Sequence, residues 1–191
     1  MADDETPQSP GSGKMLWFYA SLTTLVGCDW GTKSLVNQQL AVGEEIPVID
    51  GLLSWLHAEN PDAMFSLPVP LPIIVVGGLF LLGALLWTLW QLPRGARVQA
   101  AAIGTLAAGA IGNLGDRLLD GSVTDFIRVY TDHPELAPWL VRQFGSATWP
   151  IFNVADACIF AGIGLWVVHE WFAPEDDPDQ GTGANSIVTP I

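Results

Sequence analysis

Residues 73–92 read IIVVGGLFLLGALLWTLWQL, and this stretch decides the fold. It lies within a longer segment, residues 63–93, that contains no Asp, Glu, Lys or Arg. About 20 consecutive apolar residues allow a helix to cross the hydrocarbon core of a bilayer. The stretch therefore predicts a transmembrane helix over about residues 72–92.

Three further stretches carry weaker forms of the same pattern. Residues 98–115 are uncharged and rich in Ala and Gly, and a stripe of small residues at 104, 108 and 112 would let helices approach closely. Residues 143–169 contain a single acid, Asp156. The uncharged run 15–28 spans only if its helix continues past Asp29 and Lys33. We expect an all-α membrane protein with four transmembrane helices, over about residues 15–36, 72–92, 98–116 and 150–172.

The composition fits a chain that is mostly inside a membrane. Half of the 191 residues are hydrophobic and 14% are charged, yet the net charge is -13. Much of that acidity lies in two Pro-, Gly- and Ser-rich tails, residues 1–13 and 174–191, which we expect to be disordered. One membrane domain, residues 14–173, remains. Strong acidity argues against a nucleic-acid partner, which requires a basic face.

The basic residues indicate an orientation. Lys14 precedes the first expected helix, and Arg94 and Arg97 lie in the short link between the second and third, whereas the loop 37–72 has no Lys or Arg. Because short cytoplasmic loops are enriched in Lys and Arg, we expect both termini in the cytoplasm and the loop 37–72 on the outer side. Arg117, Arg128 and Arg142, in the other expected outer loop, run against this pattern. This outer loop mixes apolar and polar residues around a Gly-containing turn, which is typical of short strands or of an interfacial segment.

Several ionisable residues fall at membrane depth, where a charge is costly and is therefore a functional candidate. Asp29 and Lys33 are four residues apart and can pair on one helix face. Asp125 follows the third expected helix, and Asp156 lies one to two turns into the fourth. Two carboxyls that share one proton can act as a general acid and a general base. The spacing alone favours a hydrogen-bonded helix acid or an ion-pathway residue at Asp156 over a catalytic role.

Short motifs in a fixed order resemble those of the bacterial lipoprotein signal peptidases (signal peptidase II), which are four-helix intramembrane aspartic proteases. Each block is a weak match alone, but the ordered set covers residues 15–172 and is specific. The blocks are DWGTK at 29–33, ENPDAMFS at 59–66, GNLGDR at 112–117 with GSVTDF at 121–126, and FNVAD at 152–156.

The resemblance implies an endopeptidase that removes the signal peptide from diacylglyceryl-modified prolipoproteins, cutting before the lipidated cysteine. It implies a catalytic pair, Asp125 and Asp156, and a small extramembrane β-rich cradle on the outer side near residues 46–67. The supporting residues that it implies are Asn60, Asn113, Asp116, Arg117, Asn153, Asp29 and Lys33. Among these, we expect the amides and Arg117 to orient the substrate, Asp116 to hold Arg117, and Asp29 with Lys33 to fix the first helix.

The same resemblance places the chain in a bacterial cytoplasmic membrane, with the active site near the outer face. The expected partners are prolipoproteins and membrane lipid, and we expect a monomer. Neither a cofactor nor a metal is expected, since the three histidines are scattered and no HExxH pattern occurs.

Two departures from the family pattern keep other functions open. Asp62 and Met64 stand where the family usually has glycine and alanine, and the stretch 131–148 is longer than a minimal family loop. A non-catalytic relative that binds lipidated precursors is one alternative. A small ion or proton transporter that uses the intramembrane acids is another.

Overall fold

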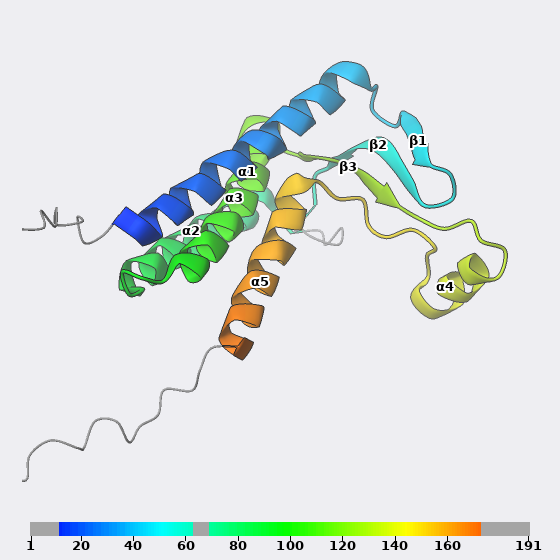
Figure 1. Ribbon diagram of the computed structural model, residues 1–191. Coiled ribbons are helices and arrows are strands. Elements are labelled where there is room, and N and C mark those ends of the chain that lie inside the picture. The colour runs from blue at the N-terminus through cyan, green and yellow to red at the C-terminus, as the bar shows by residue number, and fades with distance from the viewer. Residues whose placement is uncertain (1–11, 63–68, 173–191) are drawn as a thin grey trace, which may run out of the picture.

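A computed structural model describes residues 12–62 and 69–172 of the chain (Figure 1). Helices dominate it, and a small sheet lies at one end of them (Figure 1). The elements in chain order are α1 (Ser12–Gln39), β1 (Glu45–Ile49), β2 (Leu53–Asn60), α2 (Leu71–Gln91), α3 (Arg97–Leu119), β3 (Val123–Val129), α4 (Leu136–Phe144) and α5 (Val154–Phe172).

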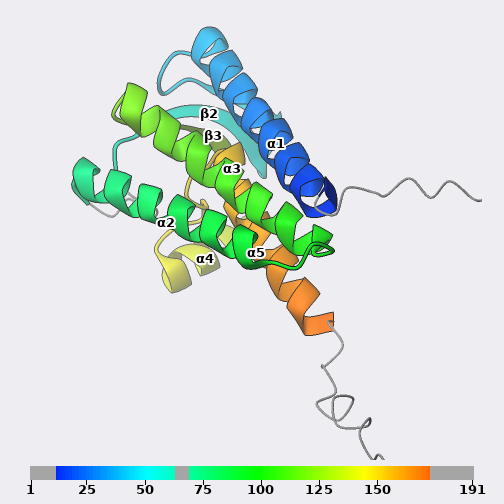
Figure 2. The same cartoon turned by 90° about the vertical axis from the view of Figure 1, so that its left-hand side faces the viewer.

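Helix α3 is the centre of the bundle, with α1, α2 and α5 around it (Figure 2). Its small residues make these contacts close. A β-carbon at Gly104 would meet the backbone of Phe18 in α1, and one at Gly109 would meet the carbonyl of Ala155 in α5. The expected small-residue stripe is therefore a helix-packing surface, and Ala108 within it is buried.

Three of the helices are long and apolar enough to cross a membrane: α2, α3 and α5. Exposed side chains of α2 and α5 include Phe80 and Trp171, as expected of helix surfaces that face lipid. Helix α1 has 28 residues but is more polar, so three of the four expected spans meet the criteria of length and hydropathy.

The outer loop forms strands, as expected. β1, β2 and β3 make an antiparallel sheet in that order, in which Ala58 pairs with Asp125 and Asn60 with Val123. Because successive side chains of a strand point to opposite faces, Asp125 and Phe126 face opposite sides of β3. Phe126 packs on Trp55, with ring centroids 5.7 Å apart. The last part of the expected cradle, residues 63–67, lies outside the described residues.

Several expected boundaries differ in the structure: α1 extends three residues further at each end and α3 three residues further at its end. The fourth expected span begins at Val154 rather than at residue 150, because the preceding segment pairs with β3: the Phe152 carbonyl accepts from the N–H of Ile127 at 2.8 Å. Asp156 is consequently in the first turn of α5, not one to two turns inside it. The helix α4 was not expected. Of the two expected tails, only Ser12 and Gly13 are described, and they begin α1.

Candidate active site

The start of α5 fixes the position of Asp156. The Asn153 side-chain oxygen accepts from the N–H of Asp156 at 3.0 Å, and the Asp156 carboxylate accepts from the N–H of Asn153 at 3.2 Å. This reciprocal pair is a capping box, which satisfies backbone donors at a helix start. The helix dipole also favours a negative group in the first turn. The local sequence NVAD therefore holds the Asp156 carboxylate at the head of α5.

Asp125 lies in the middle of β3 and is 4% exposed. Its two oxygens accept from the side-chain amides of Asn153 at 2.8 Å and Asn60 at 3.0 Å. Burial raises the pKa of Asp125 to about 6, and the charge of Asp156 acts in the same direction, while the amide donors act against it. The pKa of this carboxyl is therefore close to the pH of a working enzyme.

Asn153 and Asn113 connect the two carboxyls. Asn153 contacts both, since its side chain donates to Asp125 and its backbone N–H donates to Asp156. Asn113 of α3 donates its amide to Asp156 at 2.7 Å, and its amide oxygen accepts from Asn153 at 3.0 Å. The structure thus brings together residues from β2, β3, α3 and α5 that the sequence places up to 96 positions apart.

Lys33 is the buried cation beside this network, at 4% exposed. Its ammonium lies 2.8 Å from a carboxylate oxygen of Asp29 and 2.8 Å from one of Asp116, and it donates to the Asn113 amide oxygen at 3.2 Å. Asp29 also accepts from the backbone N–H of Ala155 at 2.8 Å. The expected Asp29–Lys33 pair is present, and it ties α1 to both α3 and α5.

The expected contact between Asp116 and Arg117 is not the one that the structure shows. Asp116 pairs with Lys33, whereas Arg117 donates to the backbone carbonyls of Asp62 at 2.8 Å and Asn113 at 3.3 Å. Neighbouring residues on a helix point in different directions, so the two side chains reach different partners. Arg117 instead holds the segment after β2 against α3.

The two carboxyls line one pocket of about 270 Å³ between α2, α3, α5 and the sheet. Its polar end carries Asn60, Asn113 and Arg117 as well. The apolar end was not predicted from the sequence, although the Gly-Gly pair in α2 was a signal, since it interrupts a run of bulky residues. The apolar lining includes Ile74, Gly77, Gly78, Leu81, Leu114, Ile159 and Phe160. A pocket whose lining combines two acids with hydrocarbon side chains suits an amphiphilic ligand.

The chain matches known proteins along most of its length. A family model described as signal peptidase (SPase) II matches residues 21–172. A lipoprotein signal peptidase of Xanthomonas axonopodis pv. citri is 33% identical, over 92% of this chain and 97% of the relative. One of Geobacter sulfurreducens is 35% identical, over 73% of this chain and 82% of the relative.

Two solved structures share the fold. Both are described as bacterial membrane enzyme structures obtained by the in meso method, one at 1.9 Å and one at 2.3 Å resolution. The first is 23% identical with a TM-score of 0.70, and covers 87% of this chain and all of its own. The second is 22% identical with a TM-score of 0.71, and covers 95% of this chain and all of its own. The family match over residues 21–172, with relatives above 30% identity over nearly their whole length, shows that this chain belongs to the signal peptidase II family.

Proposed function

We propose that this chain is an aspartic endopeptidase that removes signal peptides from diacylglyceryl-modified prolipoproteins, with Asp125 and Asp156 as its catalytic pair. The observation that carries the proposal is the linkage of these two carboxyls through Asn153 in one pocket. Family membership and the names of the relatives support the reaction. The structure supports the assignment of the residues, because it places one buried carboxyl beside a second one at a helix start.

The two carboxyls suit different tasks in hydrolysis. Asp125, whose pKa is raised to about 6 by burial, is suited to hold a proton and to donate it to the scissile carbonyl oxygen. Asp156 accepts N–H donors from Asn113 and Asn153, which orient its carboxylate, so it is suited to take a proton from water. The water oxygen then bonds to the carbonyl carbon and gives a tetrahedral intermediate.

Collapse of that intermediate completes the reaction. The carbon–nitrogen bond breaks, the proton held by Asp156 passes to the leaving nitrogen, and the carbonyl re-forms as its proton returns to Asp125. The products are a signal peptide with a new carboxyl end and a lipidated cysteine with a free amine. Asn153 and Asn113 keep the two carboxyls oriented throughout, and Lys33 fixes Asn113 through its amide oxygen.

We infer that α1 is the fourth membrane span. A helix of 28 residues is about 42 Å long, which exceeds the thickness of a bilayer core. Its charged residues Asp29 and Lys33 are buried against α3 and α5, so neither meets lipid. Lys14 donates to the carbonyls of Leu89 and Leu92 at the end of α2, on the side where Arg94 and Arg97 lie. These bases support a cytoplasmic location for that end and an outer location for the sheet.

The test is hydrolysis of a synthetic diacylglyceryl prolipopeptide by the purified protein in detergent. We expect Asp125→Asn and Asp156→Asn each to lower kcat by a factor of about 10³ or more, since each removes one partner of an acid–base pair. The matched control is Asp120→Asn, an exposed acid at the end of α3 that should leave the rate unchanged. Binding of the lipopeptide by the wild-type protein without any product would contradict the proposal and favour a non-catalytic relative.

A further inference from the structure

Helix α4 has a broad apolar surface that the proposed peptidase chemistry does not use. Its sequence is LAPWLVRQF, and the apolar residues at 136, 140 and 144 are four apart, so they share one side of the helix. The side chains of Leu136, Trp139, Val141 and Phe144 are 45%, 46%, 49% and 73% exposed. Phe144 and Trp139 contact each other edge to face, with centroids 6.0 Å apart.

This helix is held at a fixed place by the base of its loop. The N–H of Thr131 donates to the carbonyl of Ala147 at 3.0 Å, Tyr130 pairs with Thr148, and the N–H of Trp149 donates to Val129 at 2.9 Å. Among the described helices and strands, none packs extensively against α4. The loop that carries α4 is therefore hydrogen-bonded at its base, while the apolar side chains of α4 are not covered by another described helix or strand.

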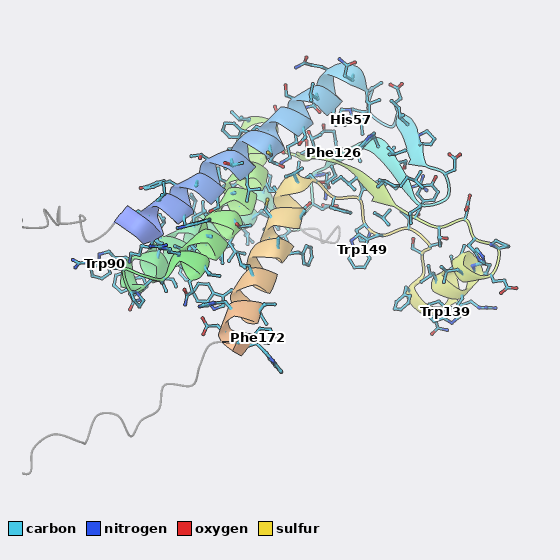
Figure 3. All side chains as sticks on the ribbon, in the orientation of Figure 1. His57, Trp90, Phe126, Trp139, Trp149 and Phe172 are labelled. Carbon is cyan, nitrogen blue, oxygen red and sulfur yellow. The ribbon has the colours of Figure 1, made fainter. Side chains whose placement is uncertain are left out.

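Helix α4 stands apart from the helix bundle, on the side of the molecule where the sheet lies. Figure 1 shows it at the right of the view, beyond the segment that leads from the sheet to the start of α5. Trp139 of α4 and Trp149, which precedes α5 and is 57% exposed, lie on this side of the molecule, whereas Trp90 and Phe172 lie toward the other end of the helices (Figure 3). Tryptophans in membrane proteins gather at the two membrane–water boundaries.

We propose that α4 lies in the boundary layer of the outer membrane surface, with Leu136, Leu140 and Phe144 in the acyl region and Arg142 toward water. The occupant of its apolar side is the bilayer itself, the apolar phase that α5 enters ten residues after α4 ends. The charges of Glu135 and Arg142 balance, so apolar burial rather than attraction to anionic lipid drives the contact. The proposal needs the membrane spans but not the catalytic assignment.

The test compares two labelled positions on opposite sides of α4. Phe144→Cys and Arg142→Cys are made in a Cys28→Ala/Cys158→Ala background, labelled with an environment-sensitive fluorophore and reconstituted in phosphatidylcholine vesicles. We expect the label at 144 to emit at shorter wavelength, to be quenched by lipid carrying a nitroxide on its acyl chain, and to be several-fold less quenched by aqueous iodide than the label at 142. Leu136→Cys, on the same side as Phe144, repeats the apolar-side measurement.

The other outcomes each overturn the proposal. Equal iodide quenching at 142 and 144 would mean that α4 stands in water. Protection of position 144 from iodide without quenching by nitroxide lipid would mean that protein covers it, whether a second copy of this chain or the active-site rim. A requirement for added phosphatidylglycerol would mean that anionic headgroups, rather than apolar burial, hold the helix.

Discussion

Asp125 combines deep burial with two amide donors, and these two features have opposite effects on its charge. Burial favours the protonated form, whereas the N–H groups of Asn60 and Asn153 favour the ionised one. With a pKa of about 6, the carboxyl loses its proton as the pH rises through that value. If Asp125 is the acid of the pair, kcat/KM falls on the alkaline side of about 6.

Asn60→Ala tests this balance. The substitution removes a donor that stabilises ionised Asp125, so the pKa of the carboxyl should rise and the alkaline limb of kcat/KM should move to higher pH. The measurement is the pH profile of lipopeptide hydrolysis. Asn37→Ala is the control, because Asn37 contacts Thr124 and not Asp125. Movement of an acid limb instead would reverse the roles of the two carboxyls.

Contacts between side chains of different helices were the hardest features of the site to predict. The motif order identified Asp116 and Arg117, but the expected pair between them was wrong, and Lys33 is the partner of Asp116. The sequence gives the spacing along one helix, whereas the pairing depends on how α1 and α3 are rotated and shifted against each other. The role of Asn153 at the start of α5 was also missed, although NVAD is a local capping pattern that the sequence contains.

The ion pair of Lys33 with Asp116 joins helix α1 to helix α3. Lys33→Met would leave Asp29 and Asp116 close together without their cation, and breaking a buried ion pair in this way costs about 3–5 kcal/mol. We expect a lower resistance to thermal unfolding in detergent and a lower kcat, since the Asn113 amide oxygen loses one of its two donors. Ser34→Ala, one residue along on the exposed side, should behave like wild type. A Lys33→Met protein as stable as wild type would show that the ion pairs do not hold α1.

Helices α1, α3 and α5 approach one another closely at Gly112, so a larger residue there should weaken their packing. A β-carbon there would lie 3.0 Å from that of Ala155 and would also meet the Asp29 carboxylate. Gly112→Ala should therefore push the helices apart, lower the free energy of unfolding by about 1–3 kcal/mol and reduce activity. Gly83→Ala in α2 has open space and should be neutral or slightly stabilising. Equal stability of the two variants would contradict the packing described for α3.

The elements themselves were largely predictable, for physical reasons that differ between them. An uncharged apolar run specified α2 nearly to the residue, because hydropathy alone determines a span. The helix α4 was missed, since nine residues are too few for a clear period and Pro138 lies within them. The start of α5 was placed too early at Pro150, because the pairing of Phe152 with β3 depends on a strand that is distant in sequence.

Across the whole molecule, the two ends of the bundle differ in charge and in architecture. Lys14, Arg94 and Arg97 are at one end, and the sheet and the candidate site are at the other. The sheet end also carries Arg117 and Arg128, but these are held by the Asp62 carbonyl and the Glu45 carboxylate. The positive-inside rule therefore predicts which end faces the cytoplasm.

Labelling of single cysteines measures that orientation, in a background where Cys28 and Cys158 are replaced by alanine. In intact spheroplasts, a membrane-impermeant maleimide should label Asp120→Cys at the sheet end. Gly95→Cys, in the exposed link between α2 and α3, should be labelled only after the spheroplasts are lysed. The reverse pattern would place the candidate site on the cytoplasmic side and would conflict with processing at the outer face.

The paired base of the loop 131–148 has a consequence for how such a protein can change over evolution. Because Thr131 meets Ala147 and Tyr130 meets Thr148, the chain leaves and re-enters the sheet at one place. The part of the loop between Thr131 and Ala147 can therefore be lengthened, shortened or exchanged without moving the Asp125 and Asp156 side chains relative to each other. Lineages are free to diversify this insert under their own selection, and an engineer could graft a reporter peptide at the same position.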